Sequence, residues 1–484
     1  MGGFLYGKLE LMAQTFFFYD LETSGLNPRI DRIMQFAGQR TDMDLQPIGE
    51  PVNVLVKLND DTLPSPEAVM VTGITPQSTQ ADGYTEAEFA QLLYDEVFTE
   101  DTITVGFNSV RFDDEFIRYL FWRTFRDPYL WAWKDGRSRW DILDVVRMTR
   151  ALRPGGIEWP VDKDGKATNR LELITNANGI THQNAHDALS DVEALIDVSK
   201  LLKTKQPKLF EYLLSIRDKK SVQKLVNLDD KQPFVYTSGR YSNEHDKTTV
   251  AFPLTSAPNS NVTVYDLRHD PSAFLSLSQD ELTKKMYASW DERKTDGFVP
   301  LPVKTLQYNR CPAVAPLGVL EQEDGWSKIG LSLEIIEKHK KLLLENPDFA
   351  EKIRTLIEKR PDFVSGKDAE AKLYEGFLDG PDSLRVETVR NADENTLADF
   401  NPNFTDERLS DLLLHYKARN YPKTLSEGEM KVWEAWRAER LTSQLPDYLK
   451  ALQRLAASAD DTKRFLLEEL QLWAEAIMPE LDGE

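Results

Sequence analysis

The chain has 484 residues, of which 41% are hydrophobic and 29% are charged, and its formal net charge is −21. This length predicts two or three domains, and the absence of an apolar run near the roughly 20 residues that cross a bilayer argues against a membrane protein. The net charge argues against a protein that coats DNA over its whole surface, although a basic groove can exist inside an acidic shell.

The N-terminal segment 1–14 lacks the basic region and the long apolar stretch of a signal peptide, which predicts a cytoplasmic location. Met12 is an alternative start, and residues 1–14 are expected to be an extension that precedes the fold. Cys311 is the single cysteine, which excludes an internal disulfide and a cysteine-based zinc site. We expect it to be a small buried apolar side chain.

Residues 15–205 show strand patterns first and then strands alternating with helices, which predicts an α/β sheet. Strands are expected at "TFFFYDLE", "RIMQFAGQRTD", "VNVLVKL" and "DTITVGFN". Helices are expected at "TEAEFAQLLYDEVF", "DDEFIRYLFWRTF", "WDILDVVRMTRAL", "RLELITNANGI" and "AHDALSDVEALIDVSKLLK".

The remainder of the chain changes pattern twice. Residues 206–355 contain the strand-like pieces "PFVYTSGRY", "TTVAFPLT", "NVTVYDLR" and "LPVKTLQY" between turn-rich segments, which predicts a small β barrel or sandwich with short helices at its ends. Residues 356–484 are helical almost throughout, as in "DERLSDLLLHYKARNY" and "FLLEELQLWAEAIM".

The stretch "FFFYDLETSG" places two carboxylates at the end of an aromatic strand pattern. Side chains two residues apart on a strand point to the same face, so Asp20 and Glu22 would crowd each other. Like charges in contact resist being ionised together, and acids that emerge from an apolar run are costly without a partner. A hard divalent cation with oxygen ligands is the simplest candidate for that partner.

Two later segments carry further acids. Asp113 follows a predicted strand in "GFNSVRFDDEF", and His186 and Asp191 lie five residues apart in "NAHDALSDVEAL". On a regular helix this spacing separates the directions of the His186 and Asp191 side chains by about 140°. Both side chains can therefore face the same metal site only if His186 lies at the very start of the first helical turn. Asn184 or Asp187 would then cap the helix, which is the ordinary structural role of such a residue.

Taken singly, a lone aspartate on a helix or a lone histidine is more typical of a solvated surface or a satisfied core, whereas the Asp20–Glu22 pair slightly favours a metal site. As an ordered set, "DLETSG", "NSVRFD" and "AHDALSD" resemble the three motifs of the proofreading-exonuclease superfamily, in its subclass with four acids and a histidine. The resemblance implies a ribonuclease-H-like domain in which Asp20, Glu22, Asp113 and Asp191 hold two Mg²⁺ ions, for which Mn²⁺ can substitute. It also implies that His186 takes the proton of the attacking water, a role that suits its near-neutral pKa.

Longer stretches are similar to the exonuclease I family: "VRFDDEFIRYLFWRTFRDPYLWAW", "SRWDILDV", "ALRPGGIEWP", "NAHDALSDV" and "NYPKTLSEGE". That resemblance implies an exonuclease domain at 15–205, an SH3-like β domain at 206–355 and a helical domain at 356–484. It implies a monomeric 3′→5′ exonuclease that degrades single-stranded DNA to 5′-mononucleotides. An RNA-trimming exonuclease is an alternative, since the same motifs serve RNA, and a non-catalytic scaffold is another.

The interleaving of aromatic and basic residues in "FWRTFRDPYLWAWKDGRSRW" is typical of single-strand binding, where rings stack on bases and arginines follow the backbone. The family's pattern assigns substrate contacts to Glu22, Arg118, Tyr129, Trp133, Arg147 and Arg170. Core packing is the alternative, and it is favoured for Phe112, Trp131 and Trp140.

The resemblance also implies a protein partner, the acidic C-terminal tail of the single-strand-binding protein. Arg153 in "ALRPGGIEWP" matches the family's arginine that receives the terminal carboxylate of that tail. An arginine suits a carboxylate because its planar fork donates two parallel hydrogen bonds. The structural alternative is that Arg153 caps the preceding helix, where a cation near the last carbonyls is favourable.

Overall fold

The computed structural model describes residues 14–182, 187–359 and 365–479. The chain divides into two compact units. Unit 1 comprises Met1–Ser138, His182–Glu193 and Val364–Glu484, and unit 2 comprises Arg139–Thr181 and Ala194–Phe363.

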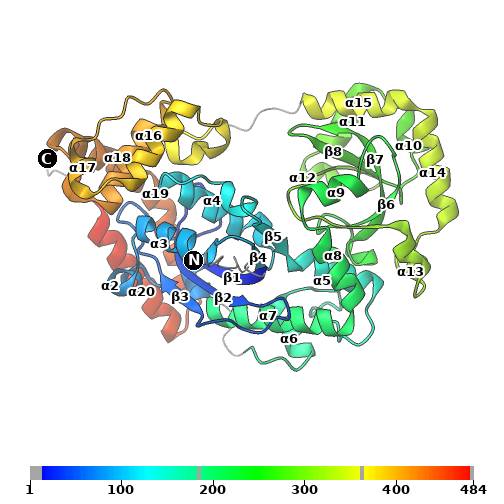
Figure 1. Ribbon diagram of the computed structural model, residues 1–484, viewed down its shortest axis with the longest axis horizontal. Coiled ribbons are helices and arrows are strands. Elements are labelled where there is room, and N and C mark those ends of the chain that lie inside the picture. The colour runs from blue at the N-terminus through cyan, green and yellow to red at the C-terminus, as the bar shows by residue number, and fades with distance from the viewer. Residues whose placement is uncertain (1–13, 183–186, 360–364, 480–484) are drawn as a thin grey trace, which may run out of the picture. The chain divides into compact units, whose positions relative to one another are not determined.

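Strands β1 to β4 of unit 1 belong to a five-stranded sheet with the order β3-β2-β1-β4-β5 (Figure 1). β1 pairs antiparallel with β2 and parallel with β4, and β2 pairs antiparallel with β3, so the expected mixed sheet is confirmed. β5 was not expected from the sequence. The strands are β1 (Thr15–Thr23), β2 (Ile33–Thr41), β3 (Val52–Leu55), β4 (Thr102–Gly106) and β5 (Ser138–Asp141).

The central strand β1 has two different faces. Phe17, Tyr19 and Leu21 belong to a buried cluster that also contains residues of α3 (Glu86–Leu92) and α4 (Asp113–Arg123). The alternate positions begin with buried Phe16 and Phe18 and end with the acids Asp20 and Glu22, which are partly exposed. Because alternate side chains of a strand lie on one face, the face that has Phe16 and Phe18 in the core also has Asp20 and Glu22 at its end.

Gly38 on β2 shows how tightly this core is packed. It lies opposite Tyr19 in the register of the β1–β2 pair. A Cβ atom at this position would come within 2.2 Å of the Phe17 ring, so only glycine leaves room for that ring. The other side of the Phe17 ring is within reach of the Arg40 guanidinium, 5.1 Å from the ring centroid.

The helices of unit 1 include two that the sequence interpretation missed, α1 and α2. Their start signals are present: Ser65 and Thr75 cap the two helices, and a proline follows each cap. The expected helices at 85–98 and 113–125 are confirmed. The helices of this part are α1 (Pro66–Thr72), α2 (Pro76–Asp82), α3, the π-helical η1 (Leu93–Val97), η2 (Ser109–Arg111), α4, η3 (Leu130–Ala132) and the start of α7 (Ala188–Lys205).

The helical C-terminal part of the chain belongs to the same unit. α19 and α20 form a hydrophobic cluster with Met34, Leu58 and Val69, and α16 to α18 form another with Tyr119 and Trp122 of α4. The helices are η6 (Ala369–Glu375), α16 (Gly380–Asn391), α17 (Glu394–Asp399), α18 (Arg408–Asn420), η7 (Pro422–Thr424), α19 (Glu427–Ala456) and α20 (Asp461–Ile477).

A buried network of ion pairs connects the two parts of unit 1. Glu370 accepts hydrogen bonds from Arg32 at 2.7 Å and pairs with Arg419 at 2.5 Å, while Arg419 also pairs with Asp61 at 2.8 Å. All four side chains are at most 2% exposed. Arg440, His415, Arg123 and Glu86 extend the network.

Arginine charges dominate the electrostatics of this network. Burial acts to raise the pKa of Asp61, but the charges of Arg419, Arg440 and Arg32 outweigh it and hold that pKa below its usual range. The same holds for Glu370, where Arg419, Arg32 and His415 overcome the effect of burial on the pKa. Both carboxylates are therefore ionised and compensated within the protein.

Unit 2 contains a second five-stranded sheet, with the order β10-β6-β7-β8-β9 and all pairs antiparallel. The expected strands are confirmed, and β10 is additional. α14 and α15 pack against β7 (Figure 1). The strands are β6 (Phe234–Thr237), β7 (Thr248–Ala257), β8 (Asn261–Asp266), β9 (Val303–Leu306) and β10 (Ala313–Pro316).

The remaining helices of unit 2 include α8 and α9, which precede β6 and agree with the short helices expected at the ends of the β region. α9 has a clear start signal, because the Asp218 side chain accepts hydrogen bonds from the N–H groups of Lys220 and Ser221. The helices are α5 (Ile142–Leu152), α6 (Leu171–Ala177), α8 (Pro207–Ser215), α9 (Lys219–Leu225), η4 (Asn243–His245), α10 (Ser272–Leu275), α11 (Gln279–Tyr287), α12 (Trp290–Arg293), η5 (Leu317–Glu321), α13 (Gly325–Lys328), α14 (Leu333–Glu345) and α15 (Pro347–Glu358).

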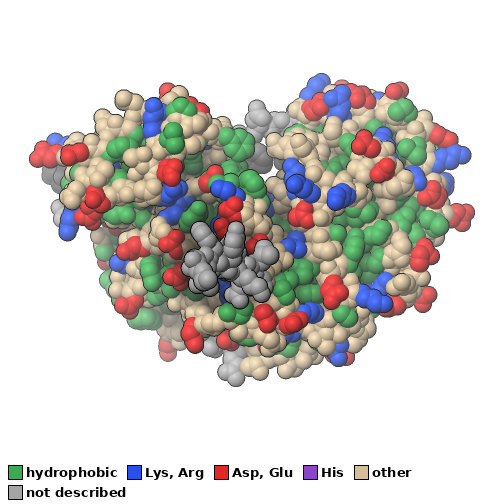
Figure 2. Space-filling model, viewed as in Figure 1, with side chains coloured by type: hydrophobic (Ala, Val, Ile, Leu, Met, Phe, Trp, Pro, Cys, Tyr) green, Lys and Arg blue, Asp and Glu red, His purple; other side chains and the backbone are tan. Residues whose placement is uncertain are grey.

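Several single-residue expectations are tested by burial. Trp131 and Trp140 are buried, Phe112 packs against the β1 cluster, and Cys311 is a buried free thiol, so these core predictions are confirmed. Within the described parts of the chain, no helix combines the length and apolar composition needed to cross a membrane. The face shown in Figure 2 carries acidic and basic side chains interspersed.

The buried network predicts loss of stability in acid. Carboxyl groups with a lowered pKa stabilise the fold above their unfolded pKa of about 4, and this stabilisation disappears as the pH falls below that value. We expect the thermal midpoint of unfolding to drop as the pH is lowered from 5 to 3. Arg419→Met should cost about 3–5 kcal/mol at pH 7, because it leaves Asp61 and Glu370 buried without a main partner.

The control is Lys450→Met, which removes an exposed pair with Asp447 and should change stability by less than about 1 kcal/mol. Calorimetry at several pH values measures both effects. Equal midpoints for the two variants at pH 7 would contradict a stabilising role for the network.

Candidate metal centre and strand-binding surfaces

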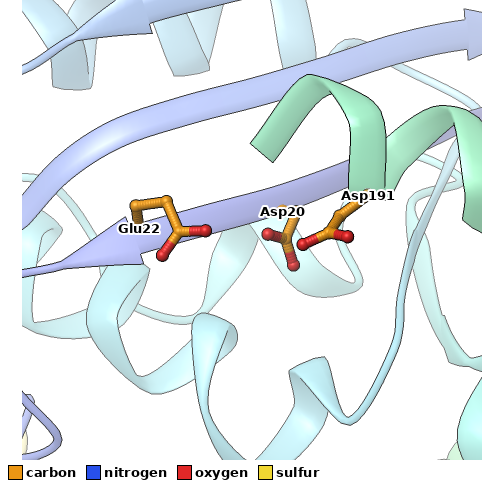
Figure 3. Close-up of side chains that lie close together, drawn as sticks. All are labelled: Asp20, Glu22 and Asp191. Atoms are coloured by element: carbon orange, nitrogen blue, oxygen red, sulfur yellow. The ribbon is translucent and has the colours of Figure 1, made fainter. Parts of the chain in front are cut away.

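Three carboxylates meet at the end of β1. Oxygen atoms of Asp20, Glu22 and Asp191 all lie within 4.8 Å of one another. Figure 3 shows the Asp20 and Asp191 carboxylates facing each other, with the Glu22 carboxylate directed to the same space. Two of the acids come from β1 and the third from the first turn of α7.

The local structure explains how each acid is held. Asp20 and Glu22 are fixed by β1, where they pair with Ala37 and Gln35 of β2. Asp191 is fixed by the cap of α7: the Asp187 carbonyl accepts its N–H at 3.0 Å, and the Asp187 carboxylate accepts the N–H of Ser190 at 3.1 Å. Of the two capping candidates, Asp187 therefore caps the helix.

The electrostatics of Asp20 and Glu22 are opposite to those of Asp61 and Glu370. Burial, followed by the charge of Asp191, raises the pKa of Asp20 to about 8, against a smaller opposing effect of the Leu21 N–H. Burial, followed by the charges of Asp20, Asp191 and Asp187, raises the pKa of Glu22 to about 9. A cation between the carboxylates would remove most of this cost, and an all-oxygen donor set suits a hard divalent metal.

Asp113 is the first residue of α4, and it is 5% exposed. Among the described residues, the group of acids within 4.8 Å does not include it. The neighbouring Asp114 accepts a hydrogen bond from the hydroxyl of Tyr19, which ties the start of α4 to β1 one residue before Asp20. The helix N-terminus favours a carboxylate at Asp113. His186 lies outside the described residues.

The structure adds a histidine that the sequence interpretation passed over. Nε2 of His182 lies 2.6 Å from Oδ1 of Asp191, and the His182 side chain is 1% exposed. The only signal in the sequence is a second histidine in "THQNAH", four residues before His186.

The expected strand-binding residues of unit 1 lie in different environments. Trp133 is 63% exposed, whereas Arg118 is 8% exposed and its guanidinium lies 5.7 Å from the centre of the Tyr129 ring. Arg118 donates hydrogen bonds to Glu115 at 3.0 Å and to the hydroxyl of Tyr374 at 3.1 Å. Arg118 therefore holds an internal cluster together.

Tyr374 and Phe377 join this aromatic surface from a distant part of the sequence. The Tyr129 ring is 6.4 Å from that of Tyr374 and 5.9 Å from that of Phe377, and Phe377 is 88% exposed. An exposed phenylalanine next to Tyr129 is available for stacking. Sequence reasoning missed it because the segment around it carries no recognisable motif.

In unit 2, the expected strand-binding residues Arg147 and Arg170 pair with different acids. Arg147 pairs with Asp144 at 2.6 Å, and a Cβ atom on Gly239 would lie 2.9 Å from its guanidinium, so a bare backbone flanks it. Arg170 is exposed beside Glu172 at the start of α6.

Two lysines of unit 2, Lys247 just before β7 and Lys304 on β9, lie near other cations. Burial and then the charge of Arg147 lower the pKa of Lys247. Burial, together with the charges of Arg240 and Lys247, lowers the pKa of Lys304 to about 8 in spite of Asp266. Cations that repel one another in this way favour binding of an anion.

Arg153 occupies the C-terminal end of α5. It donates hydrogen bonds to the carbonyls of Leu152 and Val319, each at 2.8 Å, and its Nε lies 3.7 Å from Glu323. The side chain is 8% exposed. The helix-capping alternative is therefore confirmed by the bond to Leu152.

Family models of known proteins match three successive parts of the chain. Residues 17–199 match the family model described as Exonuclease, 217–359 that of the Exonuclease I SH3-like domain, and 367–477 that of the Exonuclease I C-terminal domain. Exodeoxyribonuclease I of Haemophilus influenzae is 40% identical over 454 residues, which cover 93% of this chain and 96% of that protein.

Solved structures give the same result. Escherichia coli Exonuclease I in complex with a dA16 oligonucleotide has a TM-score of 0.92 at 38% identity, covering 96% of this chain and 100% of that one. The zinc-bound form of its complex with single-stranded DNA has a TM-score of 0.91 at 37% identity, covering 96% and 99%. With three family models in order and similarity over nearly its full length, the chain belongs to the exonuclease I family.

Proposed function

We propose that the chain is a metal-dependent exodeoxyribonuclease that hydrolyses single-stranded DNA from the 3′ end and releases 5′-mononucleotides, in DNA repair and recombination. The observation that carries this proposal is the convergence of Asp20, Glu22 and Asp191 at the end of β1. Membership of the exonuclease I family supports DNA over RNA as the substrate. It also supports the domain boundaries at 15–205, 206–355 and 356–484.

The residues of the site have different roles in this proposal. Asp20, Glu22, Asp113 and Asp191 hold two Mg²⁺ ions, for which Mn²⁺ can substitute, and Glu22 also lies beside the terminal nucleotide. The metals supply charge stabilisation of the attacking and leaving oxygens. His186 accepts the proton of the attacking water. The zinc-bound form of a relative supports a divalent metal as the cofactor.

The strand is held by two surfaces. In unit 1, Tyr129, Trp133 and Phe377 stack on bases, at about 1–3 kcal/mol per base, and Arg118 keeps Tyr129 in place. In unit 2, Arg147 and Arg170 contact phosphates, and Lys304 and Lys247 add charge to the Arg147 site. Local basic clusters of this kind allow binding of DNA by a chain whose net charge is −21.

The first prediction concerns the substrate. A single strand labelled at its 5′ end should be shortened stepwise from the 3′ end in Mg²⁺ or Mn²⁺, while a blunt duplex stays nearly intact. The duplex would have to unpair before it reached the acids, at a stacking cost of about 1.4 kcal/mol per step. A gel assay of the two substrates measures this difference.

An RNA oligonucleotide of the same sequence is the control for the rival activity. Faster trimming of RNA than of DNA would favour the exoribonuclease, and equal rates on single strand and duplex would remove the single-strand proposal. No metal-dependent cleavage of any substrate would favour the non-catalytic scaffold.

The second prediction separates the base from the metal ligands. His186→Ala should reduce turnover by roughly 10²–10⁴ and leave Mn²⁺ affinity intact, because general-base catalysis has that size. Asp20→Ala should lose Mn²⁺ affinity as well as turnover. Calorimetric Mn²⁺ titration and single-turnover kinetics measure the two effects.

The matched control is Asp197→Ala, which removes a half-exposed acid of α7 paired with Lys200 and should leave both quantities unchanged. The role assignment is wrong if His186→Ala abolishes metal binding while Asp20→Ala does not.

The third prediction concerns the partner. We propose that the enzyme, as a monomer, binds the acidic C-terminal tail of the single-strand-binding protein at Arg153. The guanidinium already caps α5, so the tail carboxylate would have to replace Glu323 beside it. Arg153→Ala should weaken binding of a labelled tail peptide tenfold or more, since a charge-assisted hydrogen bond contributes about 1.5–3 kcal/mol.

Glu323→Gln provides the complementary variant: it removes the competing carboxylate and should strengthen tail binding. Added salt should weaken binding in every case. Unchanged affinity in Arg153→Ala would remove Arg153 from the tail site, and loss of activity on naked DNA would identify its role as structural alone.

A further inference from the structure

The His182–Asp191 contact is a partly buried hydrogen bond to one of the three clustered acids. His182 Nε2 lies 2.6 Å from Asp191 Oδ1. The histidine side chain is 1% exposed, and that of Asp191 is 19% exposed. A carboxylate oxygen only accepts hydrogen bonds, so the imidazole proton of this bond is carried on Nε2.

Asp191 needs such a partner more than the other acids do. Asp20 and Glu22 project from one strand, and their relative positions follow from the strand period. Asp191 comes from α7, whose cap at Asp187 fixes its backbone but leaves its side-chain rotation open. The described contact with His182 restricts that rotation.

The direction of the carboxylate agrees with this role. In Figure 3 one oxygen of Asp191 is directed at Asp20 and the other points away from it. A carboxylate has lone pairs for several partners, so one hydrogen bond from an imidazole leaves others for a cation. Partners of this kind orient metal ligands, and their loss typically costs 10–100-fold in metal affinity.

We propose that His182 is a positioning residue of the metal centre, which orients Asp191 through its Nε2–H toward the space shared with Asp20 and Glu22. This inference rests on the proposed metal-dependent function. His182 does not contact water as a base would, because its side chain is buried and its Nε2 proton is directed to Asp191.

The test compares two substitutions in the full chain. His182→Leu removes the donor, whereas His182→Gln keeps an N–H group at a similar reach. Mn²⁺ affinity, measured by calorimetry without DNA, should fall 10–100-fold in His182→Leu and stay close to wild type in His182→Gln. Turnover of His182→Leu should recover toward wild type at saturating Mn²⁺.

The control is His339→Leu, which removes another buried histidine, bonded to the Leu267 carbonyl at 2.7 Å within unit 2. It should leave Mn²⁺ affinity unchanged. Thermal unfolding of each variant separates a folding defect from a binding defect, and His182→Gln carries the test if His182→Leu does not fold.

Two results would overturn the proposal. Unchanged Mn²⁺ affinity in His182→Leu excludes a positioning role, and a turnover that stays 10²–10⁴-fold low at saturating metal identifies His182 as a base. Failure of the wild-type chain to bind Mn²⁺, with cleavage independent of metal, would instead refute the proposed function itself.

Discussion

The alternation of side chains along β1 is the constraint on which the rest of unit 1 depends. One face, with Phe17, Tyr19 and Leu21, forms the core beneath α3 and α4. The other face ends in Asp20 and Glu22, which lie on the same side of the sheet because they are two residues apart on the strand. A shift of one residue in the register with β2 would bury both carboxylates and expose the core, so packing of the aromatic residues also fixes the position of the acids.

Two groups of buried acids in this unit have opposite electrostatics, and the difference separates structure from function. Arginines lower the pKa of Asp61 and Glu370, so these carboxylates are compensated internally and join the C-terminal helices to the sheet. Burial and mutual repulsion raise the pKa of Asp20 and Glu22 instead. Clustered carboxylates with a raised pKa are the ones for which a metal is the natural partner.

The same comparison applies to the arginines assigned to ligands. Arg118 and Arg153 are buried and already hydrogen-bonded, the first within an aromatic cluster and the second at a helix end. A ligand at either guanidinium would therefore have to compete with partners that the fold already supplies. Trp133 and Phe377, by contrast, expose most of their surface and have rings free to stack.

The sequence alone determined the features that depend on short-range periodicity: most strands of both sheets, most helices, the shared face of Asp20 and Glu22, and the motif order that indicated the family. These follow from local side-chain direction, which a short window of sequence contains. The sequence interpretation missed α1 and α2, although Ser65-Pro66 and Thr75-Pro76 are start signals.

Only the tertiary structure decided which distant residues meet. The approach of Asp191 to β1 and the arrival of Tyr374 and Phe377 beside Tyr129 join segments separated by up to about 250 residues. The contact of His182 with Asp191 joins the residues before α7 to its first turn. Such contacts depend on how helices pack on a sheet, which no local pattern encodes. Whether an acid is held by arginines or left for a metal is therefore a property of the fold, since it depends on neighbours that the chain supplies from elsewhere.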